Sequence, residues 1–354
     1  MKFFKINLKN KKQLLTLKNK FDGNLVFGSK KFHKSTYRTG KGPANGKIVE
    51  ELKKIVSKRN NDERLNKYWE EVKNCPICKS KKRSLFTKRF CLEIKECENC
   101  GLGYLSPRVK FKTAVKLYSN EKTNVPIYSS KTNIKMDKIK YKYGLSIINK
   151  LGSNQKRCLD LGTGRGIFLE VANNLGWEQC YGFDVNKNWK KKFIEKKGIS
   201  LINSEWEKIN NIYIQNKFDL ITMWDAFEHT YDLDYLTKFI KKNLSSNGYF
   251  LILVPNFHSL ATKTIRSLSP TFAWKHTLYF SKKSLNFWAK KNKMKNIFFE
   301  TVVSEIDNIK SYFSGKWPYD GYGDPKNIFK NITPEFIHNN HLGSRILAIY
   351  KNDN

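Results

Sequence analysis

The chain lacks an uninterrupted apolar run of the roughly 18 residues that a membrane-spanning helix requires, so the sequence predicts no membrane span. Its start, Met1–Lys9, is basic, but lysines interrupt every apolar cluster and no continuous hydrophobic segment of a secretory signal forms. The cysteines number seven, an odd count that argues against a disulfide framework. These absences favour a cytoplasmic protein.

Acidic residues are scarce, since 31 Asp and Glu stand against 67 Lys and Arg, a net charge of +36. A basic surface binds phosphates through counterion release, so nucleic acid, an anionic lipid surface or a phosphorylated substrate is a candidate partner. Most of the excess is Lys, whereas Arg is the usual reader of phosphates and bases. The Lys is spread along the chain with abundant Asn and Ile, as an AT-rich coding sequence would produce. This distribution favours a compositional origin over a specific anionic partner.

The glycine-rich stretch Cys158–Glu170 is the segment around which the predicted fold is organised. An apolar run with an acid near its end, three glycines at alternate positions and a second apolar run predict a strand, a tight turn and a helix start. Glycine lets the backbone take positive φ and approach a ligand, and the N–H groups of a helix start favour an anionic group. The stretch therefore predicts an anionic, nucleoside-like ligand.

The spacing of the glycines excludes the dinucleotide-binding fingerprint, because the third glycine of that pattern would fall at Ile167. What remains is a Gly-x-Gly-x-Gly pattern that follows an acid. This pattern resembles motif I of the class I S-adenosylmethionine (SAM) methyltransferases. The resemblance implies that Asp160, Gly162, Gly164 and Gly166 hold the methionine part of SAM.

A second acid, Asp184, closes the apolar stretch Cys180–Val185 about twenty residues after the glycine turn. A carboxylate at this place can accept hydrogen bonds from both hydroxyls of a ribose, so Asp184 is predicted to bind the ribose. The alternative is a helix N-cap. In the resembled family an adenine-contacting residue follows the next strand, which implies Asn203, Ser204 or Glu205.

The next predicted strand, Phe218–Trp224, runs into the sequence Asp-Ala-Phe-Glu-His, which ends at His229. The carboxyl ends of the strands in a doubly wound sheet line the ligand site, so these residues are expected there. The run resembles the strand-four signature of the ubiquinone-type and sugar-type methyltransferases. By this resemblance Trp224 contacts the cofactor and His229 is a candidate general base. The alternative for His229 is a helix-start residue bonded to the backbone.

A second candidate base, His276, lies in the tract Trp274–Ser281. The tract resembles the substrate-side loop of the same family, which carries a histidine and then an aromatic-serine pair. A structural loop histidine is the alternative. Ser281 is predicted to cap the following helix.

Four of the seven cysteines form two Cys-x-x-Cys pairs, Cys75 with Cys78 and Cys97 with Cys100. Pairs at this separation can place four thiolates tetrahedrally around Zn²⁺, which a short segment uses as a substitute for a core. Four sulfur ligands leave the metal no open position, so a structural zinc ion is predicted rather than a catalytic one.

Two short strands, Ser84–Thr87 and Phe90–Ile94, are predicted between the cysteine pairs as a hairpin. Cys91 falls outside the pairs and is expected to pack rather than to bind metal. The stretch Cys75–Arg108 resembles the amino-terminal zinc-binding module of a bacterial group of SAM methyltransferases. Members of that group often act in sugar, surface-polysaccharide or secondary-metabolite pathways.

Strands alternate with helices over 157–254, which predicts an α/β fold with a mostly parallel sheet covered on both faces. Together with the resemblance, this gives a Rossmann-like SAM methyltransferase sheet with its last strand antiparallel and an N-terminal zinc ribbon. Four predicted regions follow: 1–74, a basic extension with two short helices over 48–73; 75–108, the zinc ribbon; 109–156, a helical connection; and 157–354, the methyltransferase domain, with an aromatic-rich insertion at about 304–343.

The resemblance implies SAM-dependent methyl transfer to a small-molecule, sugar or lipid- or polysaccharide-precursor acceptor. An RNA methyltransferase or a zinc-ribbon nucleic-acid-binding protein is the alternative, and a degenerate SAM-binding scaffold is a third. Base methyltransferases commonly carry an Asn/Asp-Pro-Pro-aromatic motif where this chain has Trp224–Phe227, which weighs against a base substrate. The intact glycine turn and Asp184 weigh against the scaffold.

Overall fold

The computed structural model describes most of the chain between residues 68 and 352. The described residues are 18, 68–89, 92–120, 131–186, 198–202, 204–211, 214, 216–269, 271–306, 309 and 330–352. Several predictions fall outside them, namely most of the basic extension, Cys91, Asn203 and the insertion aromatics Tyr312, Phe313, Trp317, Tyr319 and Tyr322.

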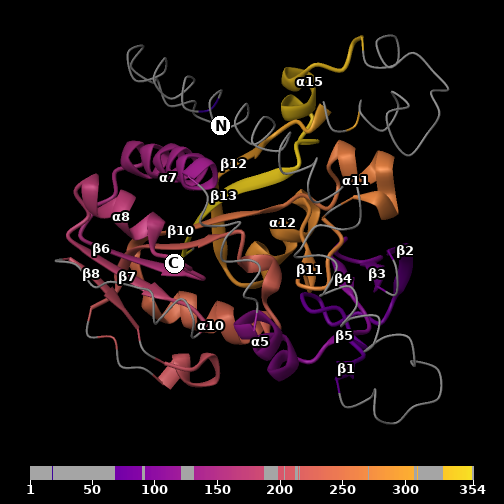
Figure 1. Cartoon of the computed structure of the whole chain (residues 1–354), viewed down its shortest axis with the longest axis horizontal. Helices are drawn as coiled ribbons and strands as arrows, with labels where there is room; N and C mark the ends of the chain where they lie inside the picture. The colour runs from indigo at the N-terminus through magenta and orange to yellow at the C-terminus, as the bar shows by residue number, and fades with distance from the viewer. Residues whose placement is uncertain are drawn as a thin grey trace.

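The centre of the protein is a seven-stranded sheet with the order β12-β13-β10-β9-β6-β7-β8 (Figure 1). Its strands are β6 (Arg157–Leu161), β7 (Gln179–Phe183), β8 (Ile199–Leu201), β9 (Phe218–Trp224), β10 (Leu244–Pro255), β12 (Met294–Val302) and β13 (Arg345–Asn352). The neighbouring strands from β10 to β8 are parallel to one another, whereas β13 runs antiparallel to both β10 and β12. The predicted mostly parallel sheet with a final antiparallel strand is confirmed.

Alternate residues of the central strands enter two different hydrophobic clusters, one on each face of the sheet. In β13, Ile346 and Ala348 join one cluster while Leu347 and Ile349 join the other, as the two-residue period of a strand requires. The first face is covered by α10 (Leu233–Asn243) and α12 (Lys282–Lys291), and the second by α7 (Lys131–Lys150) and α8 (Ile167–Asn174). Ser281 caps α12 through a capping box, as predicted.

The sequence Ser246–Tyr249 also predicts a turn, and the start of β10 differs from this prediction. The strand begins at Leu244, which pairs with Phe218, and its register shifts before Tyr249, which pairs with Leu220. Gly248 lies within this irregularity, where a Cβ would stand 2.8 Å from the carbonyl oxygen of Phe218. The expected turn is therefore a distortion inside a longer strand.

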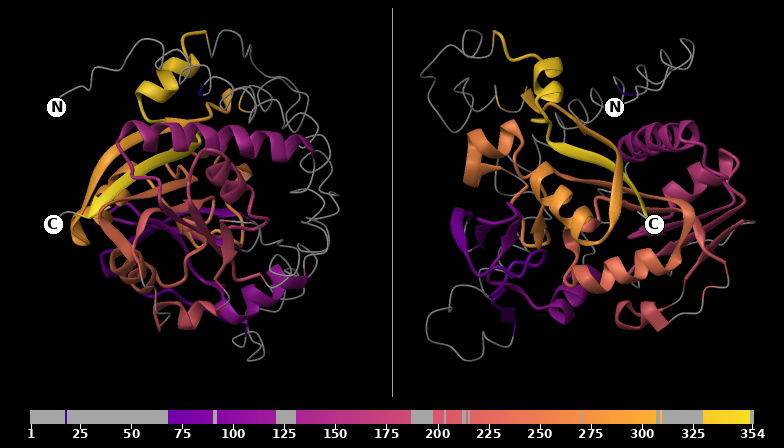
Figure 2. Two further views of the ribbon diagram at one scale, coloured as in Figure 1. Left: turned by 90° about the vertical axis from the view of Figure 1, so that its left-hand side faces the viewer. Right: turned by 180° about the vertical axis from the view of Figure 1, so that it is seen from behind.

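A second, four-stranded sheet has the order β11-β4-β3-β2. Its strands are β2 (Arg83–Arg89), β3 (Leu92–Cys97), β4 (Gly103–Leu105) and β11 (Leu278–Tyr279). The pairing of β2 with β3 confirms the hairpin predicted between the cysteine pairs. The fourth strand comes from far along the chain, since β11 pairs with β4, and the indigo strands accordingly lie beside the orange segment in Figures 1 and 2.

The helix predicted to end near Val72 is wrong in its described part. Trp69–Glu70 forms β1 instead, which pairs antiparallel with β5 (Arg108–Val109). The carboxylate of Glu70 also accepts a hydrogen bond from Arg108 Nε at 2.7 Å. This long-range pairing outweighs the local helical spacing of the apolar residues.

The remaining helices are short connecting elements. They are α5 (Phe111–Asn120), α11 (Leu260–Ile265), α15 (Pro334–Asn339) and the 3₁₀ helices η1 (Trp206–Asn211), η2 (Phe227–His229) and η3 (Arg266–Leu268). Within the described ranges, no helix is both long enough and apolar enough to cross a membrane.

Candidate functional site

The glycine turn after β6 has the backbone conformation that its sequence predicts. Gly162, Gly164 and Gly166 have φ values of +87°, +52° and +74°, which favour glycine over residues with a Cβ. A Cβ on Gly162 would also lie 2.8 Å from the Cβ of Ala226, so this glycine lets the turn approach the segment that follows β9. At Gly164 a Cβ would meet no atom within 4 Å, so the turn presents bare backbone there.

Asp184 lies against this turn. Its Oδ2 accepts a hydrogen bond from Gly164 N at 2.8 Å, and its Oδ1 accepts one from Asn186 N at 2.7 Å. The backbone N–H groups of Gly162 and Thr163 both donate to the carbonyl oxygen of Phe183, at 2.8 and 3.0 Å. These bonds hold the carboxylate in one orientation, and each carboxylate oxygen can accept more than one hydrogen bond. Asp184 can therefore receive hydroxyl donors from a ligand over the turn.

Asp160 is buried one strand away, in β6. Its Oδ1 accepts a hydrogen bond of 2.7 Å from the hydroxyl of Thr222, its neighbour across the β6–β9 pair. Burial raises the pKa of Asp160 to about 7, against the opposing effect of the Thr222 hydroxyl, and the charge of Asp184 raises it further. A cationic group placed beside this carboxylate would be stabilised by its ionised form.

Trp224 ends β9 with its indole packed among side chains. The ring lies 5.1 Å from that of Tyr141 and 5.8 Å from that of Phe168, measured between centroids. A Cβ on Gly144 would come within 2.4 Å of Trp224 Cη2, so Gly144 gives the indole its place against α7. The structure thus assigns Trp224 a packing role, and its predicted contact with a cofactor stays a prediction.

The residues predicted near an adenine follow β8. Ser204 Oγ donates to the carbonyl oxygen of Glu205 at 3.2 Å, and the Glu205 carboxylate lies 3.2 Å from Lys208 Nζ with its side chain 59% exposed. Both residues are at the carboxyl end of a parallel strand, as the prediction requires. Their contact with a ligand stays a prediction.

The two candidate bases, His229 and His276, lie together although they are far apart in the sequence. Their ring centroids are 5.0 Å apart. His229 Nδ1 lies 2.7 Å from the carbonyl oxygen of Lys275, and His276 Nδ1 lies 2.7 Å from that of Thr271. A carbonyl oxygen can only accept, so each Nδ1 carries a proton and each neutral ring has its lone pair on Nε2.

Glu228 is the third member of this group, and no local sequence pattern predicts a role for it. Its Oε1 lies 3.9 Å from His229 Nε2 and 4.0 Å from His276 Nε2. Burial raises the pKa of Glu228 to about 8, and the nearby charge of Asp225 adds to the effect. Burial also lowers the pKa of His229 to about 4 and that of His276 to about 3, so both rings are neutral near pH 7.

Asp225 lies next to this group, at the site where the sequence places it, but its ion pairs were not predicted. It has a φ of +50°, and its carboxylate pairs with Lys140 Nζ at 3.0 Å and with Arg345 Nε at 3.4 Å. Burial opposes ionisation of Asp225, but the two cations outweigh burial and lower its pKa. Since Lys140 belongs to α7 and Arg345 begins β13, the two ion pairs connect three elements around the site. No local sequence pattern reveals such pairs.

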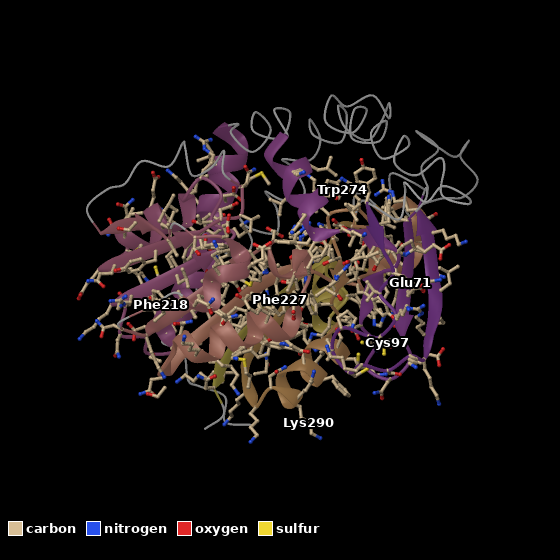
Figure 3. All side chains as sticks on the ribbon, turned by 90° about the horizontal axis from the view of Figure 1, so that it is seen from below. Glu71, Cys97, Phe218, Phe227, Trp274 and Lys290 are labelled. Carbon is tan, nitrogen blue, oxygen red and sulfur yellow. The ribbon has the colours of Figure 1, made fainter. Side chains whose placement is uncertain are left out.

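Aromatic side chains pack against the 3₁₀ helix η2 at Phe227. Phe227 stacks on Phe280 with ring centroids 4.8 Å apart and an interplanar angle of 13°, and it meets the edge of Trp288 at 5.4 Å. In Figure 3, Phe227 appears between the sheet at Phe218 and the cysteine module at Cys97. The same hydrophobic cluster extends from the sheet to three of the four paired cysteines. Glu228 and His229 are therefore carried on a firmly packed segment.

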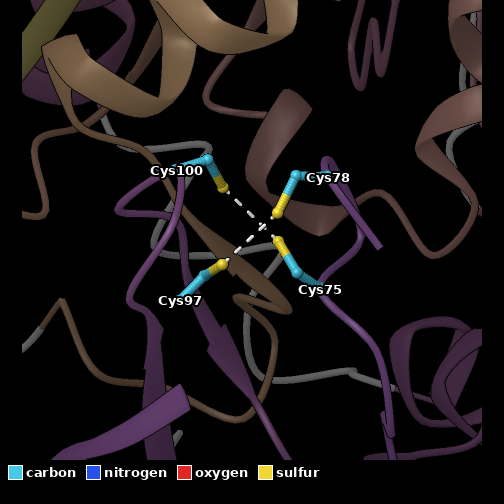
Figure 4. A group of neighbouring side chains, drawn as sticks. All are labelled: Cys75, Cys78, Cys97 and Cys100. Carbon is cyan, nitrogen blue, oxygen red and sulfur yellow. Dashed lines mark hydrogen bonds between the residues drawn. The ribbon is translucent and has the colours of Figure 1, made fainter. Parts of the chain in front are cut away.

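The four paired cysteines converge as predicted (Figure 4). The Sγ atoms of Cys75 and Cys100 are 3.5 Å apart, those of Cys78 and Cys97 are 3.4 Å apart, and all four lie within 4.8 Å of one another. A tetrahedral ion with Zn–S bonds of about 2.3 Å holds its sulfur ligands about 3.8 Å apart. The donor set and spacing fit Zn²⁺.

Comparison with known proteins finds a family model that matches the central part of the chain. Residues 138–297 match a family model described as a methyltransferase domain, a stretch that runs from α7 into β12. The predicted α/β architecture is consistent with this match. No curated protein matches the chain.

The chain is also similar to solved structures at low identity. One is a putative sarcosine dimethylglycine methyltransferase from Galdieria sulphuraria, with 16% identity, coverage of 65% of this chain and 90% of that one, and a TM-score of 0.43. Another is a SAM-dependent methyltransferase from Archaeoglobus fulgidus, with 19% identity, coverage of 62% and 94%, and a TM-score of 0.41. At these TM-scores neither bears on the acceptor of this chain.

The raised pKa of Asp160 predicts a dependence of stability on pH. Between about pH 4 and pH 7 the folded protein holds a proton on Asp160 that the unfolded chain has released. The free energy of unfolding contributed by Asp160 is therefore present at low pH and is lost as the pH rises toward 7. Each unit of pKa shift corresponds to about 1.4 kcal/mol, so Asp160→Asn should remove a difference of a few kcal/mol.

Urea unfolding at pH 4.5 and pH 7.5 measures the free energy of unfolding of the wild type and of Asp160→Asn. The wild-type value minus the Asp160→Asn value should be smaller at pH 7.5 than at pH 4.5. Thr222→Val serves as a companion, because losing the hydroxyl that donates to Asp160 should raise the pKa further and extend the loss to higher pH. Equal pH dependence in the wild type and Asp160→Asn would contradict the assignment.

Proposed function

We propose that the chain is a class I SAM-dependent methyltransferase, and the match of residues 138–297 to a methyltransferase-domain family model supports this proposal. Its acceptor is a small molecule, a sugar, or a precursor of a lipid or polysaccharide. The observation that carries the proposal is the position of Asp184, whose carboxylate is bonded to Gly164 N at 2.8 Å over a turn of three left-handed glycines. A carboxylate beside bare backbone suits a ligand that carries hydroxyl donors and approaches the turn closely.

Each residue of the site then has a task. Asp184 accepts the hydroxyl hydrogens of the ribose, the bare backbone of the Gly162–Gly166 turn lets the methionine part of SAM approach closely, and the buried Asp160 faces the amino group. Ser204 and Glu205 are assigned to the adenine, and Trp224 to a contact with the cofactor. SAM, when bound, supplies a methyl group on an electrophilic sulfonium. Holding the acceptor in line with that group can lower the activation free energy of the transfer by about 7–11 kcal/mol.

His229 and His276 are assigned to the acceptor side, where a nucleophile loses a proton. Each ring carries its Nε2 lone pair toward Glu228, with separations of 3.9 and 4.0 Å. Either histidine alone holds a proton weakly, because burial lowers its pKa. A ring that takes a proton gains a charged partner when Glu228 is ionised, which its pKa of about 8 favours at alkaline pH, so the three residues titrate as one coupled group.

The cysteine cluster is proposed to bind a structural Zn²⁺ ion. It stabilises the small sheet whose fourth strand is β11, and β11 directly follows the loop that carries His276. The metal therefore stabilises the acceptor side of the site without contacting the cofactor or the acceptor.

Calorimetric titration with SAM tests the proposed cofactor site. Asp184→Asn should weaken binding by about tenfold to a hundredfold, because a hydrogen bond to a charged group contributes about 1.5–3 kcal/mol. Asp219→Asn is the matched control, since Asp219 lies in the same sheet but its carboxylate accepts from Arg157 N, away from the turn. Equal affinity of the wild type and Asp184→Asn, with both proteins folded, would refute the assignment of the ribose site.

Metal analysis tests the proposed zinc ion. The wild type should retain Zn²⁺ through gel filtration, and Cys97→Ser should lose it and unfold at a lower urea concentration, because binding energy of a structural zinc contributes to folding. Cys180→Ser makes the same atomic exchange at a buried cysteine outside the cluster and should keep the zinc. Retention of zinc by Cys97→Ser would show that the four cysteines do not share one ion.

A further inference from the structure

We propose that Glu228, His229 and His276 bind a divalent metal ion, separate from the zinc ion of the cysteine cluster. One donor atom from each residue lies within 4.8 Å of the other two. Two imidazoles and a carboxylate are the donor set that binds Fe²⁺, Mn²⁺, Co²⁺ or Zn²⁺ with open positions for further ligands. Binding of an ion needs no SAM, so the site can be tested independently of methyl transfer.

The distances within the group fit an ion better than direct hydrogen bonds. Glu228 Oε1 lies 3.9 Å from His229 Nε2 and 4.0 Å from His276 Nε2. A hydrogen bond between these atoms would require about 3.2 Å or less. An ion with bonds of about 2.1 Å to nitrogen and oxygen can bridge two ligands that are up to about 4.2 Å apart.

The protonation of the two rings also fits metal ligands. Each Nδ1 donates its proton to a backbone carbonyl, that of Lys275 for His229 and that of Thr271 for His276. Nε2 of each ring then lies within about 4 Å of Glu228 Oε1, at 3.9 Å for His229 and 4.0 Å for His276. A histidine that binds metal through one nitrogen usually donates from the other in this way, because the second bond fixes the tautomer and the ring orientation.

Glu228 forms no ion pair with a lysine or an arginine in the described part of the chain. The residue is 1% exposed, and its Oε2 has no hydrogen-bond partner there. The nearby cations Lys140 and Arg345 pair with Asp225 instead. Because ionisation of a buried carboxyl group is costly, a divalent ion bound here would stabilise the ionised form of Glu228.

The backbone around the group is already fixed. Thr277 N donates to the carbonyl oxygen of Glu228 at 3.0 Å, and Thr277 Oγ1 donates to that of Thr230 at 2.8 Å. These bonds join the segment after β9 to the loop before β11, which together supply all three ligands. Ligands held by such supporting contacts bind a metal with little rearrangement.

The proposed ion changes the task of the two histidines, and this step rests on the proposed methyl transfer. With an ion bound, each Nε2 coordinates it and does not take a proton itself. The ion lowers the pKa of a hydroxyl or water in its open positions, which is how a bound cation prepares an oxygen nucleophile near neutral pH.

Titration of the zinc-loaded, full-length protein with Co²⁺ tests the site. The expected result is one further equivalent of Co²⁺ with visible absorption but without the charge-transfer absorption of a cobalt thiolate. Glu228→Gln and His276→Ala should each weaken binding by at least about tenfold, the loss that removal of even a supporting group causes at metal sites. His258→Ala is the control, since His258 pairs with Glu96 at 2.9 Å outside the group and should leave binding unchanged.

Three results would overturn the proposal: no Co²⁺ beyond the cysteine cluster, thiolate absorption that reveals exchange of the zinc, or equal binding by the wild type and both variants. Glu228→Gln keeps the shape of the side chain, and thermal unfolding of each variant shows that it is folded. Calorimetry with SAM on the same samples separates the two proposals. Intact SAM binding without Co²⁺ binding removes the metal site alone, and the reverse result removes the methyltransferase site alone.

Discussion

The hydrogen bonds that hold the glycine turn against the end of β7 are the contacts on which the rest of the site depends. Gly162 N and Thr163 N share the carbonyl oxygen of Phe183, and Gly164 N donates to the Asp184 carboxylate. Positive φ at the glycines makes these bonds compatible with a helix start one residue after Gly166. The carboxyl ends of β6 and β7 are thereby joined, and the segment after β9 can approach them at Ala226.

A second set of contacts joins the cysteine module to the acceptor side of the sheet. β11 pairs with β4, and Gly103 lacks a Cβ where the ring of Phe257 comes closest, at 2.7 Å from the position that a Cβ would take. The loop ahead of β11 carries His276 and is bonded to the segment that carries Glu228 and His229. The module is consequently part of the framework of the site rather than an appendage.

Much of this arrangement could be predicted from the sequence, because the signals are local. The strand-turn-helix at the glycines, the placement of Asp184 and the convergence of the cysteines follow from short spacings that limit the backbone. The contributions of Glu228 and Asp225 could not be predicted, since they depend on partners such as His276 and Arg345 that only the folded chain brings close. The helix predicted at the end of 48–73 was wrong for the same reason, because pairing of Trp69–Glu70 with the distant strand β5 determines the conformation of this segment.

The measurement that tests the account most directly is a crystal structure of the zinc-loaded protein with S-adenosylhomocysteine. The account predicts the ligand over the Gly162–Gly166 turn, with both ribose hydroxyls within hydrogen-bond distance of the Asp184 carboxylate and the sulfur on the side of His229 and His276. Clear density for the ligand at another place, with Asp184 bonded to the protein alone, would contradict it.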